Sequence, residues 1–231
     1  MIITKPTNHT IYPNYKRTAK LSARGKAMQA DEGVNQGRKK AVEPERQDGM
    51  TGIYSGPRLT AEEILTSREN RAEKLRELAQ EFPDMTLISF KLNIPGDIKT
   101  SAAIERFFRR GREQLLKELE KRTSLLHSET AFLQTGPEAV FVVDYPPAVI
   151  KLDMVALEDR DEAGRIYDID VIHDYQAISR TDLGFAPRRC FLCNEDARVC
   201  SRAGHHNLTE ILHKVKELLT LPSHKPDAGL L

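Results

Sequence analysis

The chain has 231 residues, and its 35 Lys and Arg nearly balance its 34 Asp and Glu, which gives a formal net charge of +1 at pH 7. This length predicts one domain with extensions, or two small domains, with a core that needs no disulfides. The near-zero charge argues against a chain that binds nucleic acid through its overall charge. The sequence has no run of about 18 apolar residues and no secretory signal at its start, so we expect a cytoplasmic protein without a membrane span.

The first 57 residues are polar and basic, and they follow neither helical nor strand periodicity. They predict a disordered arm, either a solvated tail or, alternatively, a segment that grips an acidic partner. We expect the folded domain over residues 58–222 and a short tail over residues 223–231. The first helix should begin after Thr60, because Glu63 three residues later completes a capping box, and it should end at Pro83.

Periodicity after this helix predicts a mixture of strands and helices. Amphipathic spacing favours helices over residues 102–126 and 208–219. Extended patterns favour strands over residues 85–92, 139–143 and 149–157, with a further short piece from Ile178. The 149–157 strand is expected to form a hairpin with a strand that follows Gly164. This order of elements predicts an α+β fold whose mostly antiparallel sheet is covered by helices on one face.

Two aspartates stand out in the strand expected after Gly164. Alternate side chains of a strand point the same way, so Asp168 and Asp170 should share one face with Cα atoms about 7 Å apart. Carboxylates this close repel each other unless a proton or a cation lies between them. Magnesium, with Asp153 or Glu158 as a third ligand, would suit phosphoryl or nucleotidyl transfer. The alternative is two solvated acids on an open strand face.

Several basic residues could supply hydrogen-bond donors to a phosphate group near this pair. Arg165 lies three residues before Asp168, and arginine can bind phosphate through two parallel hydrogen bonds. The other candidates for substrate binding are Lys99, Lys151, Arg180, Arg188 and Arg189. Some of these residues would alternatively be ordinary solvated surface groups.

All three cysteines of the chain lie within eleven residues, which favours a metal site over a disulfide framework. Cys190, Cys193, Cys200 and His206 supply three thiolates and one imidazole, the donor set of a tetrahedral structural zinc. His205 is an alternative fourth ligand. The other readings are a set of reduced thiols or, less favoured, a redox C-x-x-C pair.

These stretches resemble the holo-citrate lyase synthase family, also called apo-citrate lyase phosphoribosyl-dephospho-CoA transferase. The family pattern G-R-L-x-D-I-D-V stands here as residues 164–171, with Ile166 in place of Leu. The downstream patterns P-R-R-C-L-x-C and A-x-V-C-x-R are similar to residues 187–193 and 197–202. The resemblance covers about residues 58–220 and does not extend to the basic arm.

The resemblance implies a nucleotidyltransferase that moves phosphoribosyl-dephospho-CoA from its triphosphate-activated form to a serine of the citrate lyase acyl carrier subunit, releasing pyrophosphate. It implies these two partners, whereas the near-neutral charge and the lack of a long apolar run lead us to expect neither nucleic acid nor membrane as a partner. The magnesium on the aspartate pair follows from the chemistry of the residues and not from the family. Two alternatives stay open: transfer to another carrier, such as that of malonate decarboxylase, or a non-enzymatic zinc-knuckle module whose basic arm binds nucleic acid.

Overall fold

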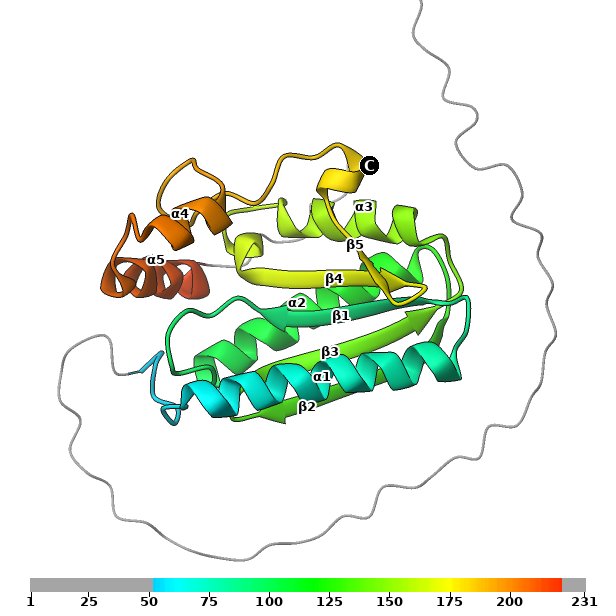
Figure 1. Ribbon diagram of the computed structural model, residues 1–231, viewed down its shortest axis with the longest axis horizontal. Helices are drawn as coiled ribbons and strands as arrows, with labels where there is room; N and C mark the ends of the chain where they lie inside the picture. The colour runs from blue at the N-terminus through cyan, green and yellow to red at the C-terminus, as the bar shows by residue number, and fades with distance from the viewer. Residues whose placement is uncertain (1–51, 222–231) are drawn as a thin grey trace, which may run out of the picture. The chain divides into compact units, whose positions relative to one another are not determined.

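The computed structural model describes residues 52–221, and a five-stranded antiparallel sheet forms its centre (Figure 1). The strands lie in the order β2-β3-β1-β4-β5. Their bounds are β1 (Thr86–Leu92), β2 (Leu125–Leu133), β3 (Gly136–Val143), β4 (Tyr167–His173) and β5 (Gln176–Ile178). The predicted α+β fold with an antiparallel sheet is therefore confirmed.

Five α-helices and two short 3-10 helices accompany this sheet within the described residues. They are α1 (Ala61–Glu81), α2 (Ala102–Glu120), α3 (Pro147–Glu158), α4 (Ala197–Ala203), α5 (Leu208–Thr220), η1 (Ala163–Ile166) and η2 (Thr181–Leu183). The capping box of Thr60 and Glu63 is present at the start of α1, as the sequence predicted. No helix within residues 52–221 is long and apolar enough to cross a lipid bilayer.

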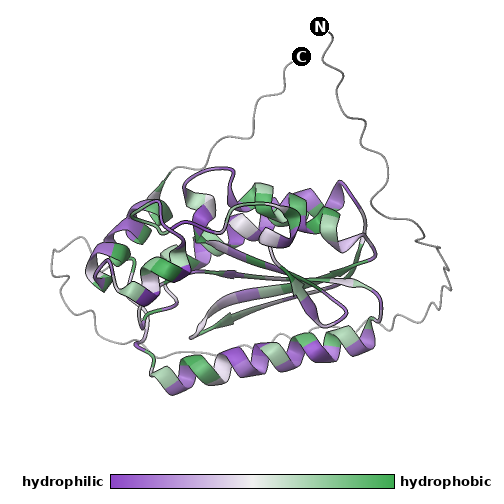
Figure 2. Ribbon diagram, turned by 45° about the horizontal axis from the view of Figure 1, so that its top comes forward, coloured by the Kyte–Doolittle hydropathy of each residue, from purple (hydrophilic) through white to green (hydrophobic). Residues whose placement is uncertain are grey.

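The larger core lies on the face of the sheet that α2, α3 and α5 cover. Phe108 of α2 stacks on Phe90 of β1 with ring centroids 4.9 Å apart, and Tyr167 of β4 meets the same ring edge-on. A smaller core lies on the opposite face, where Leu78 of α1 packs against Leu87 of β1. Figure 2 shows the sheet between α1 on one side and the other helices on the other. Helices therefore cover both faces of the sheet, where the sequence predicted cover on one face, and burial of apolar side chains on both faces stabilises this arrangement.

Two predicted elements were wrong. Residues 149–157 form helix α3 and not a strand, because Pro147 begins a helix there and Ile150, Met154 and Leu157 recur at helical spacing in the core. The expected hairpin with β4 is therefore also wrong. Strand β4 pairs with β1 along most of its length and with β5 at its end.

The helix predicted over residues 102–126 ends at Glu120, because strand β2 begins at Leu125 and pairs with β3. The arm predicted over residues 1–57 was drawn too long, because residues near its end pack on the domain. Ile53 is buried in the larger core, and the Tyr54 hydroxyl donates to the backbone oxygen of Leu212 at 2.9 Å. The rest of the arm, residues 1–51, and the predicted tail lie outside the described residues.

Candidate functional site

Strand β4 presents Asp168 and Asp170 on the face of the sheet that α1 partly covers, while Tyr167, Ile169 and Val171 enter the larger core. Lys91 lies opposite Asp168 on the neighbouring strand β1. Its Nζ atom is 2.6 Å from Oδ2 of Asp168 and 3.0 Å from Oδ2 of Asp170. The cation between the two carboxylates is therefore a lysine ammonium, where the sequence interpretation placed magnesium.

The Lys91 bridge sets the protonation states of the pair. Burial raises the pKa of Asp168, but the charge and hydrogen bond of Lys91 outweigh burial, and Arg188 adds to them, so this pKa lies below its ordinary value. Burial lowers the pKa of Lys91, but the charges and hydrogen bonds of the two carboxylates raise it by more than burial lowers it, so this pKa lies above its ordinary value. Asp168 and Lys91 are therefore both ionised at neutral pH.

A pocket adjoins this bridge between α1, the end of β1 and the turn from β2 to β3. Asp168 and Lys91 line it, and so do three further basic side chains, Arg68, Arg71 and Lys99. The hydroxyl group of Ser67 donates to Thr135 across the pocket at 2.8 Å. The aspartate pair thus lies beside a cluster of positive charge, which is the environment that an anionic substrate needs.

The outer edge of β4 is held by side chains where no strand pairs with it. Strand β5 pairs only with residues 171–173. At Ile169, the backbone N–H donates to Oε1 of Glu158 at 3.0 Å, and the backbone oxygen accepts from Nζ of Lys151 at 2.9 Å. Arg188 donates to the backbone oxygen of Tyr167 at 2.6 Å. These side chains satisfy backbone groups that would otherwise lack partners.

Glu158 is the centre of this edge network and is only 3% exposed. Besides Ile169, its carboxylate binds the guanidinium groups of Arg188 and of Arg180, the latter at 2.8 Å. Lys151 is 6% exposed, and burial lowers its pKa. Lys151 and Arg180, which we predicted as phosphate ligands from the sequence, therefore belong to the network that holds the outer edge of β4.

Arg188 has a third contact, because one of its nitrogens lies 4.0 Å from Oδ1 of Asp168. It connects the edge network to the aspartate pair. The two acids considered as a third metal ligand lie elsewhere. The Glu158 carboxylate binds Ile169 and two arginines at the outer edge of β4, and Asp153 accepts two hydrogen bonds from Arg122 at 2.9 and 3.0 Å.

Arg165 joins η1 to the loop that carries the first two cysteines. Its guanidinium donates to the backbone oxygens of Cys190 and of Arg189, the latter at 3.3 Å, and lies over the ring of Phe191. The side chain of Arg189 is exposed. Gly164 allows η1 to follow α3 closely, because a Cβ atom there would lie 2.7 Å from the backbone oxygen of Glu158.

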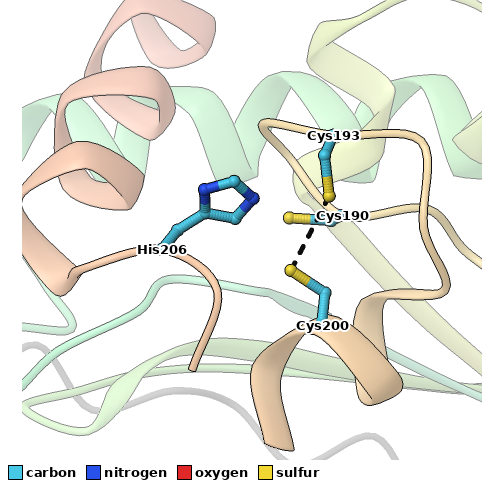
Figure 3. Close-up of side chains that lie close together, drawn as sticks. All are labelled: Cys190, Cys193, Cys200 and His206. Atoms are coloured by element: carbon cyan, nitrogen blue, oxygen red, sulfur yellow. Dashed lines mark hydrogen bonds between the residues drawn. The ribbon is translucent and has the colours of Figure 1, made fainter. Parts of the chain in front are cut away.

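The cysteine and histidine side chains predicted to bind metal do converge. Ligand atoms of Cys190, Cys193, Cys200 and His206 all lie within 4.8 Å of one another, and Figure 3 shows these side chains pointing toward a common centre. The Sγ atoms of Cys193 and Cys200 are 3.7 Å apart. Two thiolates on a tetrahedral zinc lie about 3.8 Å apart, given Zn–S bonds of about 2.3 Å.

His206 and not His205 completes this cluster. Nε2 of His206 is buried and has no hydrogen-bond partner among the described residues, whereas Nδ1 of His205 lies 2.9 Å from a carboxylate oxygen of Glu195. A buried imidazole nitrogen without a partner is unfavourable unless a ligand binds it. Burial raises the pKa of Cys190, but hydrogen bonds from the backbone N–H groups of Leu192 and Cys193 and from the Cys200 and Cys193 thiols together leave it below its ordinary value.

The structure therefore brings Asp168 and Asp170 together, places Lys99 in the adjoining pocket, and gathers the four metal-ligand candidates. Sequence reasoning missed Lys91 and Arg68. Lys91 shares the alternation of the predicted 85–92 strand with Ser89, so its face could have been deduced. Its pairing with Asp168 depends on the register between β1 and β4, which local pattern does not determine.

These features define an α+β protein with a charged site on an antiparallel sheet and a separate Cys₃His cluster. A family model described as "Apo-citrate lyase phosphoribosyl-dephospho-CoA transferase" matches residues 59–221. The chain belongs to this family of transferases, as the resemblance of its motifs predicted.

Individual relatives agree with this assignment. A protein of Streptococcus pyogenes serotype M3, named "Probable apo-citrate lyase phosphoribosyl-dephospho-CoA transferase", is 34% identical over 175 residues, which is 72% of this chain and 88% of the relative. A transferase of the same name from Shigella boydii serotype 18, without the word "probable", is 33% identical over 68% of this chain and 86% of the relative. "Protein CitXG" of Leuconostoc mesenteroides is 33% identical over 74% of this chain, which spans only 37% of that relative.

Replacing Lys91 with Met should raise the pKa of Asp168, because the two carboxylates would then repel each other without an intervening cation. Carboxyl ¹³C NMR titration measures this pKa, which should lie below about 3.9 in the unchanged protein. A lowered pKa contributes stability above the unfolded-state pKa, and this stability is lost as pH falls through the folded-state value. In the Lys91→Met protein, Asp168 should therefore make a smaller contribution to the fall in the free energy of unfolding at acid pH.

The matched control is Lys74→Met, which removes an ion pair between α1 and Glu129 of strand β2. It should leave the titration of Asp168 unchanged. An equal Asp168 pKa in the Lys91→Met protein and the unchanged protein would contradict the bridge.

Proposed function

We propose that this chain transfers phosphoribosyl-dephospho-CoA from its triphosphate-activated form to a serine of the apo-acyl carrier subunit of citrate lyase. The observation that carries the proposal is the aspartate pair beside a basic pocket in a chain of this transferase family. The names of the relatives supply the citrate lyase context. The proposed reaction is of the nucleotidyltransferase type, since a phosphodiester forms and pyrophosphate leaves.

In the proposed reaction the serine oxygen bonds to the α-phosphorus of the donor. The bond from that phosphorus to the bridging oxygen breaks, and pyrophosphate leaves with the electron pair. Asp170 is the more exposed carboxylate and is placed to accept the serine proton. Lys91, between the carboxylates, supplies fixed positive charge next to the position where phosphate charge develops.

Magnesium is part of this proposal as an ion that accompanies the triphosphate. Lys91 contacts one oxygen of each aspartate, and each carboxylate has a second oxygen with further lone pairs. Asp168 and Asp170 would hold the ion through these remaining oxygens. The ion would neutralise phosphate charge and align the attacking and leaving oxygens.

The transfer is tested by mass spectrometry of apo-acyl carrier protein incubated with this chain, triphosphoribosyl-dephospho-CoA and magnesium. The carrier should gain the mass of the prosthetic group, with one pyrophosphate released for each group transferred. Asp168→Asn and Asp170→Asn should each reduce the rate at least about 100-fold, as loss of a general base or metal ligand does. Asp153→Asn, which changes a carboxylate bound to Arg122, should retain the rate.

Full activity in both the Asp168→Asn and Asp170→Asn proteins would contradict the assigned site. Modification of the malonate decarboxylase carrier in preference to the citrate lyase carrier would contradict the proposed acceptor. Undiminished transfer after removal of magnesium with a chelator would contradict the metal.

We propose separately that Cys190, Cys193, Cys200 and His206 bind one structural zinc ion. Four protein ligands leave no open coordination position, so the ion would order the chain and take no part in transfer. The loop that the ion would fix carries Arg188 and the backbone oxygens that bind Arg165. The ion would therefore help to hold Arg188 against the backbone of β4.

Elemental analysis of the purified protein should find about one zinc per chain, as expected for a single tetrahedral site. His206→Ala should lose the metal and lower the melting temperature, because it removes a ligand. His205→Ala should keep the metal, because its imidazole pairs with Glu195. A zinc-free protein with unchanged melting temperature, or equal metal content in the two variants, would contradict this assignment.

A further inference from the structure

The pocket beside Asp168 contains more positive charge than the neighbouring carboxylates neutralise. Arg71 pairs with Glu138 at 2.6 Å, and Lys91 pairs with the two aspartates. Arg68 and Lys99 also line the pocket, and neither has a carboxylate within ion-pair distance among residues 52–221. These two side chains are therefore the uncompensated cations of the pocket.

Arg68 and Lys99 also affect each other. Burial lowers the pKa of Lys99, and the neighbouring charge of Arg68 lowers it further. Asp97 acts on Lys99 in the opposite direction, but its carboxylate is bound to Arg58 at 2.7 Å. Two cations that repel each other in a pocket are stabilised when an anion lies between them.

The backbone around Lys99 is held in a fixed position. Its ammonium donates to the backbone oxygen of Ile94, and the adjacent N–H of Leu59 donates to the backbone oxygen of Asp97 at 2.9 Å. Gly136, with φ of +110°, brings the turn between β2 and β3 against the backbone of Lys99, because a Cβ atom there would lie 3.3 Å from the Lys99 oxygen. A cation held in this way loses little conformational freedom when it binds a ligand.

Arg68 approaches the same pocket from the opposite wall. It lies on α1 one turn before Arg71, so the two guanidinium groups lie on one side of the helix. Arg71 is fixed by Glu138, whereas Arg68 is exposed and its guanidinium makes no hydrogen bond or ion pair with another residue of the 52–221 range. Planar guanidinium groups bind phosphate oxygens through two parallel hydrogen bonds. The pocket volume of about 120 Å³ accommodates a phosphate-sized group.

We propose that Arg68 and Lys99 form a pyrophosphate-binding site, which receives the leaving part of a polyphosphate ester whose reacting phosphorus lies at Asp168 and Lys91. The role as leaving-group site depends on the proposed transfer reaction. The anion site itself depends only on the charges and walls of the pocket. Under this assignment Arg68, which the sequence analysis did not name as a site residue, becomes a substrate-binding residue, and Lys99 is assigned specifically to the leaving group.

Isothermal titration of the full chain with magnesium-free pyrophosphate tests the site without any carrier protein. Pyrophosphate should bind, and Arg68→Ala and Lys99→Met should each weaken it about tenfold or more, as expected for loss of a charge-assisted hydrogen bond. Arg76→Ala is the matched control, since Arg76 is also exposed on α1 but pairs with Glu73. Arg76→Ala should leave the dissociation constant unchanged, and melting temperatures report whether each variant is folded.

Binding of pyrophosphate to Arg68→Ala and Lys99→Met as tightly as to the unchanged protein would overturn the site. Absence of binding to the unchanged protein at millimolar concentration would do the same. The carrier assay separates this inference from the proposed function. Pyrophosphate binding that depends on Arg68 and Lys99, together with no transfer to any carrier, would support the anion site and reject the transfer reaction.

Discussion

The buried carboxylate of Glu158 is the contact on which the rest of the site depends. It lies at the end of α3, where it binds the backbone N–H of Ile169 and the side chains of Arg180 and Arg188. A buried charge is unfavourable unless its lone pairs are satisfied by good donors, and here three groups supply them. Loss of this one carboxylate would leave the backbone amide of Ile169 without its partner and would remove one ion pair from each of two arginines.

The side chains at the outer edge of β4 connect this strand to both candidate sites, the aspartate pair and the Cys₃His cluster. On one face of β4 the aspartates meet Lys91 and the basic pocket, and along its outer edge Arg188 connects it to the cysteine loop. Arg165 adds a second connection from η1 to that loop. The loop of the Cys₃His cluster is therefore connected to β4 through Arg188, although the cluster does not contact Asp168. One short motif, residues 164–171, thus contains a glycine needed for close packing, an arginine that binds the cysteine loop, and the two acids that contact Lys91.

The sequence predicted what depends on local pattern. The capping box at Thr60, the shared face of Asp168 and Asp170 and the grouping of the cysteines follow from spacing along one element or loop. Helix α3 was missed because a short apolar run does not distinguish a buried helix from a strand. Lys91 was missed because its contact with Asp168 is set by the register between two strands that are far apart in the sequence, which periodicity does not determine. Lys151 and Arg180 were predicted as phosphate donors, but they bind Ile169 and Glu158 at the edge of β4. The sequence shows the charge of a residue and does not show which buried partner it has.

Amide hydrogen exchange at Ile169 tests most directly whether Glu158 holds β4 in place. In the unchanged protein this amide should exchange slowly although no strand pairs with it, because Glu158 accepts its hydrogen bond at 3.0 Å. Glu158→Ala should greatly accelerate its exchange. Asp159→Ala, which removes the neighbouring carboxylate that also binds Arg180, should leave it slow. Fast exchange at Ile169 in the unchanged protein, or equal exchange in Glu158→Ala and the unchanged protein, would contradict this account.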